Sequence, residues 1–199
     1  NTVVTSSMIA KSDEKTTNDL RIQEYNMLRL SSQIAAEDYI DIRFRMPSGE
    51  DYIVVSKKKV EIPQIDGVDS ATTIWLQLTE DEILTMSNAI VENYMIEGSV
   101  LYTAKYVEPG TQEKATPTYV PSEEVQNLLR NNDSNILNTA KLALLTRYQG
   151  NSDVRNNINN TKNSIDPDDV ATNISTGVKQ EVSTAQEQRQ DYLDALSGN

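Results

Sequence analysis

The passage that most constrains the fold contains a strand signal, a helix signal and a second strand signal in direct succession. Residues 72–78 (TTIWLQL) favour a strand, and the apolar residues that follow recur at helical spacing over a wide face. Thr79 and Glu82 have the spacing of a capping box, in which each side chain pairs with a backbone amide of the first helical turn. A glycine ends this pattern, and residues 99–107 (SVLYTAKYV) again favour a strand. The passage therefore predicts a β-α-β unit.

Two segments with different periods precede this unit. Residues 39–46 alternate apolar with charged side chains, a Pro-Ser-Gly turn signal follows, and a second apolar run continues to residue 62. Strict alternation is typical of half-buried strands, so this segment predicts a β-hairpin. From about residue 16 to residue 37, apolar side chains such as Leu20, Tyr25 and Leu28 lie near helical spacing and predict an N-terminal helix.

Two short helical patterns follow the unit. The first runs from Ser122 through Leu129 and the second from about residue 134 to residue 148, so together they predict a helical hairpin. Residues 150–165 are rich in asparagine and poor in apolar side chains. Such a segment buries too little surface to offset the entropy of ordering, and we predict a linker.

The predicted fold class is α+β. It consists of a small mixed domain with an N-terminal helix, a β-hairpin, a β-α-β unit and a helical hairpin, followed by an Asn-rich linker and a long C-terminal helix. The predicted boundaries are an N-terminal arm over 1–15, the α+β domain over 16–149, the linker over 150–165 and a C-terminal assembly helix over 166–199.

Three carboxylates close together at Asp166, Asp168 and Asp169 raise the question of a metal site. An EF-hand loop has acids at alternate positions, a central glycine and a terminal glutamate, and that spacing is absent here. The positions instead fit a helix start, with Asp166 as N-cap, Pro167 at the first position and the other two acids in the first turn. We therefore predict a helix start, with no metal and no cofactor.

The C-terminal helix carries an apolar stripe spaced mostly by threes and fours. Its members are Val170, Ile174, Val178, Val182, Ala185, Tyr192 and Leu196. At 1.5 Å per residue the helix is about 45 Å long, whereas a domain of this size has a radius of gyration of about 15 Å. The helix is therefore expected to overhang its own domain and to bind another chain, and mid-helix Gly177 costs it about 1 kcal/mol against alanine. The alternative is a helix that folds back on its own domain or stays disordered.

Positive side chains gather on the predicted hairpin. They are Arg43, Arg45, Lys57, Lys58 and Lys59. One interpretation is a contact for an anion or a partner protein, and the other is the protection of a strand edge by charge. We favour the second, because a net charge of −12 repels nucleic acid phosphates and anionic membranes.

Composition excludes several classes of protein. The chain has no histidine and no cysteine, so thiol chemistry and the usual proton shuttle at neutral pH are absent. Acid pairs such as Glu80 with Glu82 and Glu123 with Glu124 fall in predicted first helical turns, and no phosphate loop or nucleophile motif is present. No apolar run approaches the roughly 18 residues that span a bilayer. We therefore expect a soluble protein that is not an enzyme.

The chain resembles virion structural proteins of tailed bacteriophages in overall character. It is small, acidic, rich in Asn and Thr, and contains a Pro-containing arm, YVEPGTQEKATPTYVPS, over residues 106–122. Head-to-tail connector, ring and capsid auxiliary proteins share this character. The resemblance assigns no functional residues, but it implies a subunit whose arms and last helix bind neighbouring subunits.

The resulting prediction is a non-enzymatic assembly protein. Its expected partners are protein subunits, either further copies of itself in a ring or higher homo-oligomer or other virion proteins, with neither a membrane nor nucleic acid as partner. Its expected location is the virion, after a soluble stage in the host cytoplasm. The alternatives are a soluble adaptor that binds one host protein and, third, a carboxylate-based enzyme.

Overall fold

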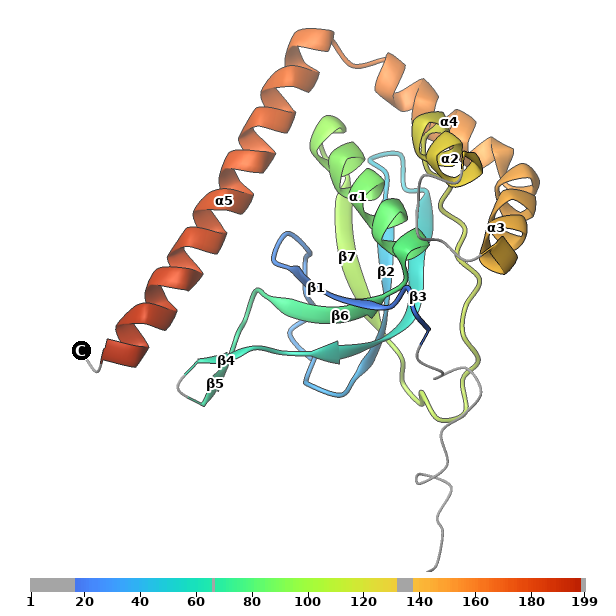
Figure 1. Cartoon of the computed structure of the whole chain (residues 1–199). Coiled ribbons are helices and arrows are strands. Elements are labelled where there is room, and N and C mark those ends of the chain that lie inside the picture. Colours follow the sequence, from blue (N-terminus) through green and yellow to red (C-terminus); the bar gives the residue numbers. More distant parts are fainter. Residues whose placement is uncertain (1–16, 66, 132–137, 198–199) are drawn as a thin grey trace, which may run out of the picture.

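The computed structural model describes residues 17–65, 67–131 and 138–197, and the predicted hairpin lies at its centre (Figure 1). Strand β2 (Tyr39–Arg45) and strand β3 (Asp51–Glu61) pair antiparallel, which confirms the alternation pattern. Ile40, Ile42 and Phe44 are fully buried on the core side of β2. Their alternation with charged residues thus places these three side chains on one face of the strand.

The sheet has five strands in the order β1-β6-β3-β2-β7, and each neighbouring pair is antiparallel. The outer strands are β1 (Arg21–Tyr25) and β7 (Val100–Lys105), and β6 (Ile74–Leu78) lies beside β1. A two-stranded extension, β4 (Gln64–Ile65) with β5 (Val68–Asp69), projects from the lower edge in Figure 1. The α+β class is therefore confirmed.

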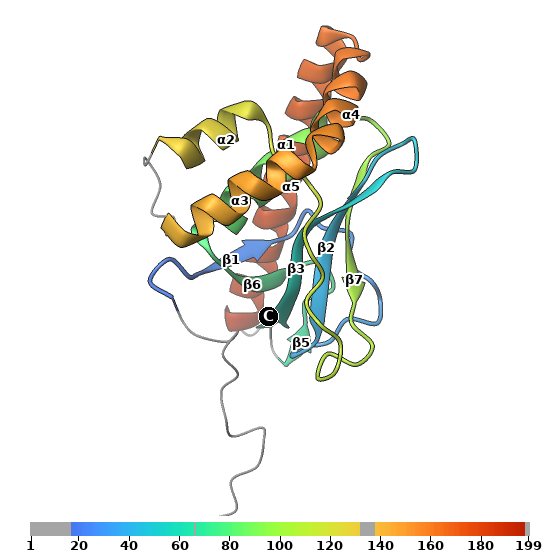
Figure 2. The same ribbon diagram turned by 90° about the vertical axis from the view of Figure 1, so that its right-hand side faces the viewer.

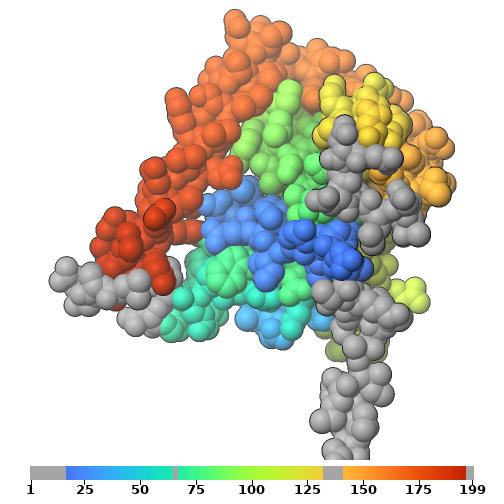
Figure 3. All heavy atoms as spheres, viewed as in Figure 1, coloured from blue at the N-terminus to red at the C-terminus, as the bar shows by residue number. Residues whose placement is uncertain are grey.

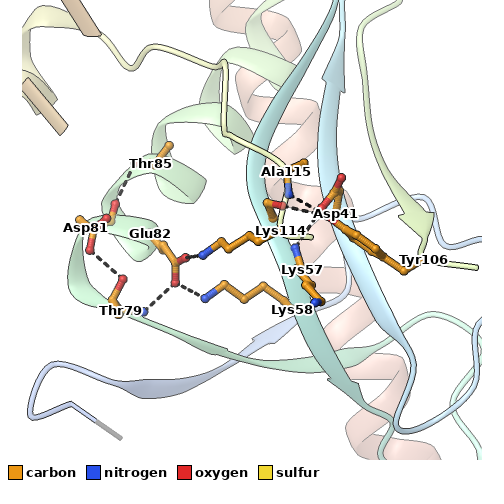
Figure 4. Close-up of polar contacts among 11 residues, drawn as sticks. Asp41, Lys57, Lys58, Thr79, Asp81, Glu82, Thr85, Tyr106, Lys114 and Ala115 are labelled. Atoms are coloured by element: carbon orange, nitrogen blue, oxygen red, sulfur yellow. Dashed lines mark hydrogen bonds and ion pairs between the residues drawn. The ribbon is translucent and has the colours of Figure 1, made fainter. Parts of the chain in front are cut away.

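A β-bulge in β3 lies opposite Asp41. The pairing register of β2 and β3 shifts on either side of Ile42, and Lys57 has a φ of 48°. Asp41 is 7% exposed, and its Oδ1 accepts a hydrogen bond from Lys57 N at 2.9 Å (Figure 4). Bulges bend a strand and increase its twist. Strand β3 pairs with β2 from Asp51 to Lys59 and with β6 through Val60 and Glu61.

Helix α1 (Glu80–Met95) packs on the sheet as the helix of the predicted β-α-β unit. The capping box is present, and Glu82 Oε2 accepts from Thr79 N at 3.0 Å. Met86 and Ala89 are fully buried on the face toward the sheet. The two flanking strands, however, do not pair with each other, because β3 and β2 lie between β6 and β7.

The predicted N-terminal helix is wrong. Residues 21–25 form β1, which pairs with β6 along its whole length. The apolar residues of this segment are spaced like a helix, yet Tyr25 and Leu28 enter the core from a strand and from the turn after it. Pairing with a distant strand outweighs a weak local period. The expected arm over 1–15 lies outside the described residues.

The predicted helical hairpin is confirmed by α2 (Glu123–Arg130) and α3 (Asn138–Gly150), which share a second small core. The part of the second predicted helix before residue 138 lies outside the described residues. The predicted linker is wrong, because Ser152–Asn163 form helix α4. Ile158 of α4 is fully buried in the main core. A few apolar residues at helical spacing are enough to stabilise a helix when the core of the domain covers them.

Helix α5 (Pro167–Ser197) is the predicted C-terminal helix. Figure 1 shows α1 between α5 on one side and α2, α3 and α4 on the other. Figure 2 views the molecule from the side of α3 and α4, with α5 behind them. In the space-filling view, α5 follows the flank of the body from α1 down to the region of β4 and β5 (Figure 3). The helix lies beside its own domain along this flank.

Candidate functional site

The acidic stretch over 166–169 begins α5, as predicted. Asp166 Oδ1 accepts a hydrogen bond from Asp168 N at 2.9 Å, and Asp166 O accepts from Val170 N at 3.0 Å. Pro167 is the first helical residue, and the acids of the first turn face the positive end of the helix dipole. In the part of the chain that the structure describes, no group of three or more acidic side chains is placed to hold a metal ion.

The side of α5 that touches the body is mostly polar. A Cβ atom built on Gly177 would lie 2.4 Å from Cδ1 of Tyr94, so the glycine lets the tyrosine ring of α1 lie against the α5 backbone. One turn further, the Tyr94 hydroxyl donates to Glu181 Oε2 at 2.7 Å. Burial, and then the neighbouring Glu181 carboxylate, raise the pKa of Tyr94, so the hydroxyl stays protonated as a donor. Gln188 Oε1 accepts from Thr73 Oγ1 at 2.6 Å, which ties the second half of α5 to the start of β6.

Among the described side chains of α5, three branched aliphatic residues remain exposed beside this polar contact, and we call them the α5 apolar stripe. Their exposed fractions are 45% for Val178, 49% for Val182 and 48% for Leu193. Val178 and Val182 each follow a body-facing residue by one position, which rotates them about 100° around the helix axis. The helix therefore packs on its own domain through hydrogen bonds and leaves an apolar strip on the surface.

The seven residues predicted as an intermolecular stripe divide into two groups. Val170 and Ile174 are half-buried, so the expectation of a helix that overhangs its own domain is wrong for this part of α5. Val178, Val182, Ala185 and Tyr192 are exposed, and the side chain of Leu196 lies outside the description. Among the helices and strands of the body, α1 is the main neighbour of α5.

Each of the five cations predicted as an anion or partner contact has a partner in its own chain. Three form ion pairs, namely Arg43 with Asp51, Lys58 with Glu82 and Lys59 with Glu37. The other two are Lys57, whose ammonium donates to the Gln112 carbonyl, and Arg45, which lies over the ring of Tyr102. The partners lie on several different elements of the same chain, which favours the structural interpretation of this cluster.

A polar cluster at the start of α1 joins three elements (Figure 4). The Glu82 carboxylate caps the helix and also pairs with Lys58 of β3 at 2.5 Å and with Lys114 of the connection after β7 at 3.7 Å. Burial raises the pKa of the adjacent Asp81 and lowers the pKa of Lys58. A cavity of about 330 Å³ opens beside these groups.

Perturbed pKa values beside a cavity are one property of catalytic groups. In this cluster the Glu82 carboxylate is already shared between the helix cap and two lysines, and Asp81 accepts from the Thr79 hydroxyl at 2.7 Å. These contacts attach α1 to the sheet and to the long connection. The prediction that the protein is not an enzyme stays a prediction.

A buried ion pair between α1 and α4 was not predicted. Glu92 is fully buried, and its carboxylate pairs with Arg155 at 2.8 Å, pairs with Lys162 at 3.4 Å and accepts from the Tyr119 hydroxyl at 2.6 Å. Burial raises the pKa of Tyr119 well above its ordinary value, so its hydroxyl remains a donor. Glu92 continues the buried face of α1 after Met86 and Ala89, and an acid in that position signals a buried partner. Because the sequence predicted a linker over 150–165, Arg155 was not recognised as this partner.

The longest helix, α5, has 31 residues and carries charged side chains along its length. None of the helices in the described part of the chain combines the length and the apolar character needed to cross a membrane. No protein-family model, no curated protein and no solved structure matches this chain.

Proposed function

We propose that this chain is a non-enzymatic structural protein that assembles with further copies of itself through the α5 apolar stripe. The observation that carries the proposal is the orientation of α5, which meets its own body with Gly177, Glu181 and Gln188 and leaves Val178 and Val182 exposed. A surface helix normally buries its apolar stripe and exposes its polar one. A helix that buries its polar side and exposes its apolar side is expected when a second chain covers the apolar side.

The size of the stripe suits an assembly with several contacts per subunit. Fully burying an aliphatic side chain contributes about 1.5–3 kcal/mol, and side chains that are already half covered contribute roughly half of that. Three such residues make a weak contact on their own, after the entropic cost of association is subtracted. A closed ring or shell joins each subunit through more than one contact, and tethered contacts act at high effective concentration.

Charge also supports a protein partner. The net charge of −12 opposes nucleic acid, and the predicted cationic cluster is paired within the chain. Two copies of the protein repel each other at long range, and salt screens this repulsion. Self-association is therefore expected to strengthen as the ionic strength rises.

The resemblance to virion structural proteins extends the proposal to a specific setting. In that setting the protein is a subunit of a tailed bacteriophage particle, as a connector, ring or capsid-associated component. Subunits must stay separate before assembly, so the contact through the α5 apolar stripe must be weak. The small number of exposed apolar residues agrees with this requirement.

Sedimentation velocity of the full chain tests the proposal. Concentrations from about 1 µM to about 1 mM cover contact free energies from about −8 to −4 kcal/mol. We expect concentration-dependent species larger than a monomer, more of them at high salt, and their loss in the triple variant Val178→Ser, Val182→Ser and Leu193→Ser. The matched control is Ser183→Ala with Gln186→Ala, which changes exposed polar residues on the same helix.

The proposal is wrong if the wild-type chain remains monomeric over this whole range at high salt. It is also wrong if the triple variant associates as strongly as the wild type. Exposed substitutions of this kind change stability by about 0.5 kcal/mol or less, so α5 is expected to stay folded in both variants. Circular dichroism checks this.

A further inference from the structure

Two aromatic side chains face the same cleft between α5 and the sheet. Trp75 of β6 is 37% exposed and Tyr192 of α5 is 48% exposed, and both line a cavity of about 380 Å³. The lining also includes Pro63 and the charged residues Glu24 and Arg189, which are relevant to ligand recognition. Neither the cation cluster nor the α5 apolar stripe accounts for this pair of exposed rings.

Hydrogen bonds hold both walls of the cleft in place. The Trp75 indole Nε1 donates to Glu24 Oε2 at 2.8 Å across the β1–β6 pair, so the orientation of the ring is set before any ligand binds. On the other wall, Gln188 accepts from Thr73 Oγ1 at 2.6 Å and also donates to Thr72. Preorganised walls lower the entropic cost of binding.

The charges at the cleft select a neutral ligand. Glu24 opposes an anion, and the net charge of −12 opposes it further. Arg189 lines the same cleft and opposes a cation, although exposed aromatic rings attract cations in other settings. A neutral ligand that both donates and accepts hydrogen bonds satisfies the Glu24 carboxylate and the Arg189 guanidinium together.

We propose that this cleft binds a neutral saccharide. The C–H faces of a sugar ring pack against Trp75 and Tyr192, while its hydroxyl groups donate to Glu24 and accept from Arg189. The cavity volume lies at the lower end of the range of small-molecule sites, which corresponds to a short segment of an oligosaccharide. This binding activity goes beyond the assembly function and does not depend on it.

A proline-rich peptide is the main competing ligand for an aromatic cleft. Such a peptide offers carbonyl acceptors but few donors, because proline has no backbone N–H. The indole donor of Trp75 is already used by Glu24, and the Glu24 carboxylate would gain no donor from the peptide. A saccharide offers a hydroxyl donor to the Glu24 carboxylate and an acceptor to the Arg189 guanidinium, so it is the better match.

Trp75 is the single tryptophan of the chain, so its fluorescence reports on this cleft alone. We expect a saturable change in emission when the full chain is titrated with at least one of four neutral tetrasaccharides: cellotetraose, maltotetraose, chitotetraose and mannotetraose. Tetramethylammonium chloride and a proline decamer are titrated in parallel and are expected to leave the emission unchanged.

Calorimetric titration with the same sugar separates the cleft from the rest of the surface. Trp75→Ala and Tyr192→Ala each remove one ring, and we expect the Kd to rise about fivefold or more in each. Tyr192→Phe keeps the ring and is expected to stay within about twofold of the wild type. The matched control is Leu193→Ala, because Leu193 is as exposed as Tyr192 but does not line the cleft.

Three results would overturn the proposal. The first is no saturable change with any of the four sugars. The second is sugar binding that Trp75→Ala and Tyr192→Ala leave unaltered, provided that circular dichroism shows both variants folded. The third is binding of the ammonium salt or the proline decamer, with the same dependence on Trp75 and Tyr192, in place of the sugars.

Discussion

Helices α4 and α5 both attach to α1, and they do so by opposite means. Helix α4 inserts Ile158 into the main core and pairs Arg155 with the fully buried Glu92. Helix α5 uses the Gly177 contact and hydrogen bonds that are partly exposed to water, and its aliphatic residues Val178 and Val182 stay on the surface. The difference separates a helix that belongs to the core from a helix that presents a surface.

The energetic consequences of the two attachments differ as well. A buried ion pair that loses one partner leaves a charge in a low-dielectric environment, which costs about 3–5 kcal/mol. A partly exposed hydrogen bond contributes only about 0.5–1.5 kcal/mol. We therefore expect α4 to unfold only with the whole domain, whereas α5 opens at lower free energy.

The largest expected effect comes from Arg155→Ala, which leaves Glu92 with Lys162 and Tyr119 alone. We expect a loss of about 3 kcal/mol in the free energy of unfolding, because the buried carboxylate loses its closest cation. Urea denaturation followed by circular dichroism measures it. Lys179→Ala on the exposed side of α5 is the control, with a change of about 0.5 kcal/mol or less. A loss below about 1 kcal/mol for Arg155→Ala would show that α4 is attached no more firmly than α5.

The next effect is expected from Gly177→Ala. Alanine raises helix propensity by about 1 kcal/mol, but its methyl group collides with the Tyr94 ring, and such overpacking costs about 1–3 kcal/mol. Hydrogen exchange is expected to show faster exchange along α5 and unchanged exchange in α4. Thr176→Ala, at the preceding position, is the control. Slower exchange in α5 of the Gly177→Ala variant would mean that the ring contact does not hold the helix.

A smaller effect is expected from Tyr94→Phe, which removes the hydroxyl that donates to Glu181. The opening free energy of α5 is expected to fall by about 1 kcal/mol, because the lost bond has a charged acceptor but lies near solvent. The same hydrogen-exchange experiment measures it. Tyr192→Phe, which leaves the Tyr94–Glu181 bond in place, serves as the comparison. Equal α5 protection in both variants would contradict this role for Tyr94.

The smallest effect concerns the start of α1, where burial raises the pKa of Asp81. The folded state then binds the Asp81 proton more tightly than the unfolded state does. The stability contributed by protonated Asp81 is therefore present at low pH and lost as the pH rises through the folded pKa. We expect Asp81→Asn to gain stability relative to the wild type as the pH rises from about 4 to 7. Thermal melts across this range measure the difference, and a difference independent of pH would contradict it.

Elements with a local signal were predicted correctly. Three such signals are the alternation in β2, the capping box of α1 and the Asp166 cap of α5. Each depends on residues that are close together in the chain. The N-terminal segment failed because β1 exists only through its pairing with β6, which follows about 50 residues later in the chain. The sequence did not predict helix α4, because its apolar residues are few and their burial depends on a core built by other elements.

The candidate surfaces show the same division. The sequence identified the long helix and its apolar positions, but the side that α5 turns to its own body follows from Tyr94 and Thr73 on other elements. The cleft between Trp75 and Tyr192 joins residues more than a hundred positions apart, and no local pattern connects them.

The sequence by itself determined where most helices and strands begin, because caps, turns and periods are interactions between near neighbours in the chain. It also determined the acidic charge that limits the choice of partners. Only the tertiary structure decided which of these elements are buried, which cations are paired and which face of α5 remains exposed. The physical reason is that burial and pairing are set by groups that are distant in the chain and meet only after folding.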